Sequence, residues 1–178
     1  MTLDETLAAY NDCTRCAFSS TRRNVVHGRG DVPADILFIG ESPDKTDDLL
    51  GEAFRGPPGR KLNAMLRVAA RSTGINPRVY MTHIICCRPC DDAGGTNREP
   101  TDVEAMYCRP HLADVVAHVN PTAVVFLGQI AARYGIAVCP DGITLPHPGF
   151  LLRLGAAGDA ALRGAMRTLE SVFRKVGG

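Results

Sequence analysis

Short apolar runs alternate along the chain with longer amphipathic stretches. The apolar runs have the length of strands and lie at residues 35–40, 79–85, 122–128 and, more weakly, 142–148. The amphipathic stretches predict helices over residues 59–72, 101–119, 128–135 and about 158–175. This alternation predicts an α/β fold in which helices form layers on both faces of a central, mostly parallel four-stranded sheet. Residues 1–178 are expected to form one domain with this α/β/α arrangement.

The start of one predicted helix is marked by its own residues. Thr101 followed by Glu104 is a capping box, which predicts that a helix begins after the Gly-rich loop at residues 91–100. In an α/β protein of this kind, functional loops are expected at the carboxyl ends of the parallel strands.

Composition narrows the class of protein. The chain has 178 residues, of which 45% are hydrophobic, so it can bury a sizeable core. Lys and Arg number 20 against 19 for Asp and Glu, so a DNA-binding face must come from local clustering of basic residues. The sequence shows no secretion signal and no apolar stretch of the roughly 18 residues that span a bilayer. We therefore expect a soluble, cytoplasmic monomer without a membrane partner.

Seven cysteines are present, and an odd, grouped set argues against a secreted disulfide framework. Cys13 and Cys16 are spaced so that one tight loop can present two thiolates to a metal centre. The other half of such a site must come from Cys86, Cys87, Cys90, Cys108 or Cys139. Spacing alone leaves open zinc, an iron–sulfur cluster and a redox or inert thiol pair.

Several blocks of the sequence, taken in order, resemble family 4 uracil-DNA glycosylases, the iron–sulfur type. The blocks are CTRC (13–16), GESPDKTDD (40–48), GEAFRGPPGRKL (51–62), CCRP (86–89), CRPHL (108–112) and HPGFLLR (147–153). The resemblance implies a DNA glycosylase that flips a base out of DNA and hydrolyses its N-glycosidic bond. The expected base is uracil or a related damaged or modified pyrimidine.

The resemblance also implies a [4Fe-4S] cluster. Its ligands would be Cys13, Cys16, Cys87 and Cys108, each of which matches a cysteine of the family pattern. Cys86 and Cys90 stand where the family commonly has Lys and Pro, and Cys139 lies outside the matching blocks. These three cysteines are therefore not expected to be ligands.

By the same resemblance, two residues are catalytic. Glu41 would position water or stabilise the positive charge that develops on the sugar, and its alternative role is a turn carboxylate that caps the next segment. His147 would donate a hydrogen bond to the departing base, which leaves as an anion, and its alternative is a structural histidine. Gly40, Ser42, Phe54 and His83 are expected to form the base pocket, with Phe54 stacking on the base unless it only anchors its loop.

Five residues are expected to contact DNA. Leu151 would insert into the gap left by the flipped base, and Arg153 would then lie near a phosphate. Arg55, Arg60 and Lys61 crowd the predicted start of a helix, where they either contact phosphate or only form a solvated surface.

Two residues depart from the family pattern near the pocket. Asp44 replaces a glycine and adds charge, and His83 replaces an Asn that reads uracil with both a donor and an acceptor. An imidazole cannot make that bidentate contact. If His83 faces the pocket, uracil excision should be weak or relaxed and depend on pH near the ordinary histidine pKa of about 6.5. Its alternative is to point into the core and bond a backbone carbonyl.

Two other classes of protein remain open from the sequence. One is a catalytically weak or inactive iron–sulfur DNA-binding module of the same fold. The pocket residues Glu41, His83 and His147 are the feature that would distinguish an active enzyme from this module. The other is a zinc-bound structural protein, which would be colourless, whereas an iron–sulfur protein is brown.

Overall fold

The four apolar runs of the sequence form four parallel strands in a computed structural model that describes residues 1–178. These strands are β2 (Ile36–Gly40), β3 (Val79–His83), β4 (Ala123–Leu127) and β5 (Ile143–Leu145). β2 lies between β3 and β4, and β5 pairs with the other side of β4. The central strands are covered on both faces, which is why their sequences are continuously apolar instead of alternating.

The sheet has a fifth strand that the sequence pattern did not predict. β1 (Arg29–Gly30) pairs antiparallel with β3 at the edge of the sheet. A strand of two residues has no recognisable period, and only its partner β3 defines it. The predicted class, an α/β fold with a mostly parallel sheet, is confirmed, but the predicted number of strands is wrong.

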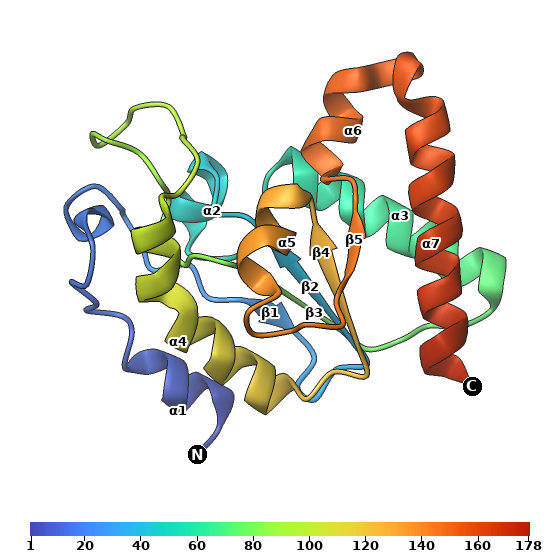
Figure 1. Ribbon diagram of the computed structural model, residues 1–178, viewed down its shortest axis with the longest axis horizontal. Helices are drawn as coiled ribbons and strands as arrows, with labels where there is room; N and C mark the ends of the chain where they lie inside the picture. The colour runs from blue at the N-terminus through green and yellow to red at the C-terminus, as the bar shows by residue number, and fades with distance from the viewer.

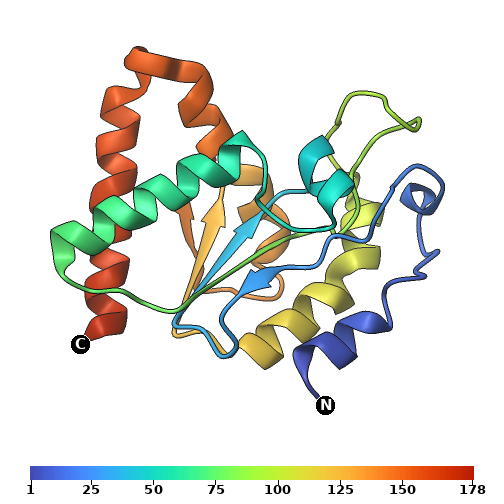
Figure 2. The ribbon, with the colours of Figure 1, turned by 180° about the vertical axis from the view of Figure 1, so that it is seen from behind.

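Helices cover both faces of the sheet (Figure 1, Figure 2). Leu37 and Ile39 of β2 point to the face that packs against α1 (Leu3–Ala8), α4 (Asp102–Val119) and α5 (Gln129–Gly135). Ile36 and Phe38 point to the opposite face, which packs against α3 (Pro57–Thr73), α6 (Pro148–Leu154) and α7 (Asp159–Gly177). The alternation of side chains along a strand therefore divides the apolar residues into two cores.

The predicted helices are confirmed as α3, α4, α5 and α7. The capping box is also confirmed, since Thr101 accepts a hydrogen bond from the Glu104 backbone N–H and the Glu104 carboxylate accepts one from the Thr101 N–H. The sequence pattern missed α1, α2 (Lys45–Leu50) and α6, which have six or seven residues each. The 3₁₀ helices are η1 (Ala17–Ser20) and η2 (Gly155–Gly158). None of the helices is both long and apolar enough to cross a membrane.

Candidate functional site

The predicted catalytic and pocket residues meet at the carboxyl edge of the sheet. Gly40 ends β2 and is in register with His83, which ends β3. On the other side of β2, Gly128 follows β4, and its backbone N–H donates to the carbonyl of Leu145 in β5, two residues before His147. Four neighbouring parallel strands thus bring distant parts of the sequence to one edge, as expected for an α/β fold.

Phe54 and His83 form a buried aromatic pair at this edge. Their rings stack with centroids 4.5 Å apart and planes 13° apart, and each residue is only 4% exposed. A side chain at Gly40 would not fit beneath them, because a Cβ there would lie 2.6 Å from the Phe54 ring and 2.9 Å from the His83 ring. The glycine that ends β2 therefore makes room for the pair.

The backbone of Phe54 is held in an unusual conformation. Its φ is +58°, a region that bulky residues rarely adopt. The N–H groups of Phe54 and Arg55 donate to the buried Asp47 carboxylate at 3.1 and 2.7 Å, and the Arg29 guanidinium donates to the carbonyls of Ala53 and Phe54. These contacts offset the strain and fix the place of the Phe54 ring, which is a pattern common at functional sites.

His83 stacks on Phe54, and its ring makes no hydrogen bond to a backbone carbonyl. Its Nε2 lies 3.7 Å from Asp47 Oδ2, and its buried Nδ1 has no hydrogen-bond partner. Burial, with a smaller contribution from nearby His147, lowers the pKa of His83 to about 3. The imidazole is therefore neutral at physiological pH, and the expectation that His83 produces a pH dependence near 6.5 is wrong.

His147 is the N-cap of α6, where its Nδ1 accepts a hydrogen bond from the Gly149 N–H at 3.1 Å. A ring nitrogen that accepts a hydrogen bond carries no proton, so the proton of the neutral ring is on Nε2. Burial, and then the charge of Arg153, lower the pKa of His147, which favours this neutral form. The capping contact thus leaves Nε2–H as a donor.

Glu41 follows β2 directly and is half-buried. Burial, followed by the charge of Glu99, raises the pKa of its carboxyl group. Glu41 does not cap α2, because Asp44 does so by accepting the N–H groups of Thr46 and Asp47 at 2.7 and 2.9 Å. These contacts also explain the acidic residue at position 44, because the backbone N–H groups at the start of α2 stabilise the Asp44 carboxylate.

A cavity of about 400 Å³ opens beside His147. His147 and Phe150 line it together with residues at the ends of β4 and β5, but Phe54 and His83 do not. The buried Phe54–His83 pair is therefore separate from the open cavity, and His147 lies next to both.

Leu151 does not lie where the sequence interpretation placed it. It is 4% exposed and packs in the core shared by α3, α6 and α7. The segment is a helix and not a loop, so the side chains on either side of Leu151 point outward, and Phe150 and Leu152 are each 44% exposed. The predicted role of Leu151 as an inserted wedge is wrong for this conformation.

The basic residues predicted to contact DNA lie around the same edge. Arg60 and Lys61 are in the first turns of α3, and Arg153 is in α6. The two helix starts are close, since a Cβ at Gly149 would lie 3.4 Å from Pro58. Arg60 and Arg153 are exposed and Lys61 is half-buried. Arg55 is exposed as well, but its guanidinium pairs with Glu52, so Arg60 and Arg153 are the more available cations.

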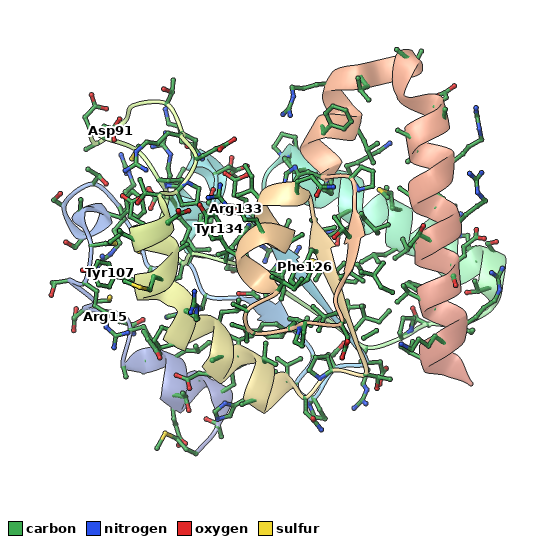
Figure 3. All side chains as sticks on the ribbon, viewed as in Figure 1. Arg15, Asp91, Tyr107, Phe126, Arg133 and Tyr134 are labelled. Atoms are coloured by element: carbon green, nitrogen blue, oxygen red, sulfur yellow. The ribbon has the colours of Figure 1, made fainter.

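The four predicted cluster ligands come from three segments of the chain. Cys13 and Cys16 lie between α1 and η1, Cys87 follows β3, and Cys108 is on α4. Arg15, from the first of these segments, lies near the part of α4 that carries Tyr107 and Cys108 (Figure 3).

The thiols of these residues influence one another. Burial, and then the proximity of Cys108, Cys87 and Cys13, raise the pKa of Cys16. The Sγ atoms of Cys86 and Cys108 are 3.9 Å apart, and this contact lowers the pKa of Cys108 to about 7. The thiols converge on one region without forming a closed metal-binding group in this structure. The soft sulfur donors and their convergence fit an iron–sulfur cluster or zinc.

Comparison with known proteins assigns the chain to a family. The family model of the Uracil DNA glycosylase superfamily matches residues 27–170. The chain belongs to this superfamily. It is 35% identical over 133 residues to a type-4 uracil-DNA glycosylase of Archaeoglobus fulgidus, an alignment that covers 74% of this chain and 62% of the relative. It is 34% identical over 123 residues to a type-4 uracil-DNA glycosylase of Thermotoga maritima, covering 68% and 59% of the two chains.

The matching region spans somewhat more than half of the length of these relatives, and 53% of a type-4 uracil-DNA glycosylase of Saccharolobus solfataricus that is 30% identical to this chain. The superfamily match includes the strands and loops that carry Glu41, Phe54, His83 and His147. Cys13 and Cys16 lie before the matched residues, so the match does not bear on them.

Sequence reasoning missed Asp47, Arg88 and Asn97. Asp47 is buried, and its carboxylate accepts a hydrogen bond from the Phe54 N–H. Arg88 is buried and donates to Asn97 Oδ1, and Asn97 Nδ2 donates to the carbonyl of Pro43 in the loop after β2. No spacing rule marks these contacts, because they join segments that are distant in the sequence.

Proposed function

We propose that this chain is a DNA glycosylase that hydrolyses the N-glycosidic bond of uracil, or of a related damaged or modified pyrimidine, in DNA. One domain, comprising residues 1–178, would carry both the active site and a [4Fe-4S] cluster. The superfamily match and the type-4 names of the relatives support the reaction class. The observation that carries the proposal is the fixed Nε2–H donor of His147 at the edge of the sheet that also holds Glu41, Phe54 and His83.

In the proposed reaction the target nucleotide first rotates out of the base stack, at a cost of a few kcal/mol. The bond between C1′ and the base nitrogen then breaks, and its electron pair leaves with the base. Nε2–H of His147 stabilises the resulting anion through a hydrogen bond, which a preorganised donor does without reorganisation. Water adds to C1′ and loses a proton to solvent or to Glu41, and the base anion takes up a proton from solvent. The products are the neutral free base and an abasic site.

Glu41 has a second part in this scheme. As a carboxylate it favours the positive charge that develops on the sugar and holds the attacking water. Its burial strengthens that electrostatic interaction, because the surroundings screen charge less than water does. The same burial raises its pKa, so the group is ionised only above a higher pH than an ordinary Glu.

Cys13, Cys16, Cys87 and Cys108 are proposed to hold the cluster. The cluster, when bound, supplies a cross-link between the segment before η1, the segment after β3 and helix α4. The proximity of Cys16 to the other three thiols supports this ligand set. Cys86 would lie beside it as a further thiol, 3.9 Å from the sulfur of Cys108.

The test is excision by the iron-loaded protein. Labelled oligonucleotides would carry uracil, 5-hydroxymethyluracil, hypoxanthine or thymine opposite each normal base, and alkali would cleave the abasic sites that form. We expect excision of uracil or of a modified pyrimidine. His147→Ala should abolish most of it, whereas His118→Ala, at a histidine of α4 that bonds Thr6, should not. No cleavage with any base would refute the proposed reaction.

A second candidate is the inactive iron–sulfur DNA-binding module. It is favoured by the stacking of His83 on Phe54, because both side chains are nearly fully buried and a base can reach the face of Phe54 only if they separate. This module would bind DNA and retain its iron without releasing any base. The excision assay and a DNA-binding measurement on the same preparation distinguish the two functions.

A further inference from the structure

Another cavity, which His147 does not line, opens at the start of α2 and carries three cationic side chains. It lies between the segment after η1, the first turn of α2 and the loop at residues 91–100. Its volume is about 240 Å³, many times the roughly 10–15 Å³ that one water molecule needs, so it admits a group of several atoms. We call it the basic cavity, and its polar lining consists of Thr21, Arg23, Lys45, Asp48 and Arg88.

The cations of the basic cavity are not paired with carboxylates. Arg23, Lys45 and Arg88 take part in none of the ion pairs of this structure. The one acidic residue of the lining, Asp48, is 3% exposed. Its Oδ1 already accepts the backbone N–H groups of Arg23 and Asn24 at 2.9 and 3.3 Å. The basic cavity therefore has an excess of positive charge.

Arg88 holds one of these charges inside the protein. Its side chain belongs to a residue that is only 5% exposed, and its guanidinium donates from Nε to Asn97 Oδ1 and from Nη2 to the carbonyl of Gly95. Both acceptors are neutral, and a buried charge without a counter-charge is costly. A guanidinium has five N–H donors, so these two contacts leave others free. An anion in the basic cavity would offset the cost of this buried charge.

The basic cavity adjoins the proposed active site. Lys45 begins α2 shortly after Glu41, and Asn97, the partner of Arg88, donates to the carbonyl of Pro43 in the loop between them. α2 and the loop at residues 91–100 lie to one side of the strand ends, and α6, which carries Arg153, lies to the other (Figure 1, Figure 2). Duplex DNA carries one negative charge per about 1.7 Å of its axis, so DNA at this edge offers phosphates to both sides.

We propose that the basic cavity binds a backbone phosphate of DNA, which Arg23 and Lys45 contact while Arg88 supplies a buried positive charge. Neither Arg23 nor Lys45 belongs to the DNA contacts expected from the sequence, which lie at α3 and α6. Phosphate contacts fix the register and orientation of DNA without reading bases, so this site would position the strand relative to the loop of Glu41. The inference rests on the proposed function for its biological meaning, but the contact can be measured without release of a base.

The test measures binding of the iron-loaded protein to a duplex with a tetrahydrofuran abasic site, which has no base to release. The logarithm of the binding constant falls with the logarithm of the salt concentration, by a slope of about 0.9 for each neutralised phosphate. Replacing both Arg23→Gln and Lys45→Gln should reduce the magnitude of this slope by about 1. Arg88 is left in place because it adjoins the predicted ligand Cys87.

A matched variant removes the same two charges elsewhere. Arg71 and Lys175 are exposed in the last turns of α3 and α7. Arg71→Gln combined with Lys175→Gln should leave the slope at its parent value. Because all four replaced side chains are exposed, both double variants should keep the iron content and the thermal midpoint of the parent.

A second measurement identifies the phosphate. Single phosphates on either side of the abasic site would be replaced, one at a time, by uncharged methylphosphonate. At the phosphate that occupies the basic cavity, this change should weaken binding by the parent about 10-fold, the scale of a hydrogen bond to a charged group. The same change should have no further effect in the variant that lacks Arg23 and Lys45. Inorganic phosphate in place of chloride, at equal ionic strength, tests free phosphate as the alternative source.

The outcomes separate this inference from the proposed function. A slope as steep without Arg23 and Lys45 as in the parent overturns the inference, whether or not the protein excises bases. An equal reduction without Arg71 and Lys175 overturns it as well. If inorganic phosphate raises the thermal midpoint of the parent alone, and no methylphosphonate position depends on Arg23 and Lys45, the assignment to DNA is overturned. A slope reduced by about 1, in a protein that releases no base, supports the inference and refutes the proposed reaction.

Discussion

In the proposed reaction His147 would combine a structural role with a chemical role. Its Nδ1 accepts from the Gly149 N–H and begins α6, and this contact places the proton on Nε2. A histidine free to rotate would have to select the tautomer and the orientation before each reaction. The hydrogen bond at the start of α6 fixes both the tautomer and the orientation of the ring before a reaction begins. A donor that is preorganised in this way stabilises developing charge.

Substitution of His147 can separate its two roles. Asn is a strong N-cap residue, so His147→Asn should retain α6 while it removes the imidazole donor. We expect a loss of on the order of 10²-fold in the single-turnover rate of base excision for His147→Asn and for His147→Ala, the scale for losing one donor to a developing anion.

Thermal unfolding provides the control for this prediction. The midpoint of His147→Asn should lie closer to that of the parent than the midpoint of His147→Ala, and binding to DNA with an abasic site should change little in either. A His147→Asn protein that excises bases at the parent rate would show that His147 only caps the helix.

At the scale of elements, the loop at residues 91–100 connects the predicted cluster region with the predicted catalytic loop. Arg88, next to the predicted ligand Cys87, donates to Asn97 Oδ1 at 2.6 Å. Asn97 Nδ2 in turn donates to the carbonyl of Pro43 at 3.0 Å, two residues after Glu41. The loop is itself tied to α4 by the ion pair of Arg98 with Glu104.

These contacts predict that Asn97 positions the loop of Glu41. Asn97→Ala should lower the single-turnover rate roughly 10-fold, because small displacements of catalytic groups are costly. The iron content should remain that of the parent. Thr96→Ala, at the exposed neighbouring residue, is the matched control. Equal rates for Asn97→Ala and Thr96→Ala would show that the loop does not position Glu41.

The same loop predicts a change in pH dependence. In the proposed reaction Glu41 acts as a carboxylate, so activity should be present above its pKa and be lost as the pH falls through it. The charge of Glu99 contributes to the raised pKa of Glu41. Glu99→Gln should therefore lower that pKa and move the acidic limb of the rate profile to lower pH. Single-turnover rates between about pH 4 and pH 8 would test this, with Asp92→Asn as a control on the same loop. A shift in the opposite direction would contradict the assignment of Glu41.

At the scale of the whole molecule, the proposed cluster would join the segment between α1 and η1 to the segment after β3 and to helix α4. The segment with Cys13 and Cys16 is held to α4 by contacts such as the hydrogen bond of 2.5 Å from the Tyr10 hydroxyl to Asp114. The guanidinium of Arg98 also lies 5.0 Å from the centre of the Phe18 ring in η1. A metal centre between these segments would add folding free energy, since metal binding and folding are coupled.

Removal of single thiols tests the ligand set. Cys13→Ala, Cys16→Ala, Cys87→Ala and Cys108→Ala should each lose the iron and most of the soluble protein, because closed coordination needs every ligand. Cys86→Ala, Cys90→Ser and Cys139→Ser should retain about four irons per chain and the absorbance near 400 nm of an iron–sulfur protein. Full iron in Cys108→Ala, or its loss in Cys86→Ala, would contradict the assignment. If the parent protein is colourless and contains one zinc, the four cysteines form a zinc site and not an iron–sulfur cluster.

The sequence by itself determined most of the scaffold of this protein. The four apolar runs, the helix at residues 101–119 with its capping box and the place of the site at the strand ends all follow from local spacing, and the structure contains them. The order of the motif blocks indicated the family, and the superfamily match confirms it. These features can be predicted because apolar periodicity, capping and motif spacing are properties of residues close together in the chain.

Tertiary structure decided what individual side chains can do. Leu151 is a core residue because the short helix α6 turns its side chain toward the apolar residues of α3 and α7. The two-residue β1 exists only through its pairing with β3. His83 is neutral and lacks a partner at Nδ1 because Phe54, Asp47 and Gly40, each from another part of the sequence, enclose it. Burial and long-range contacts arise only when distant segments pack, so no local pattern contains them.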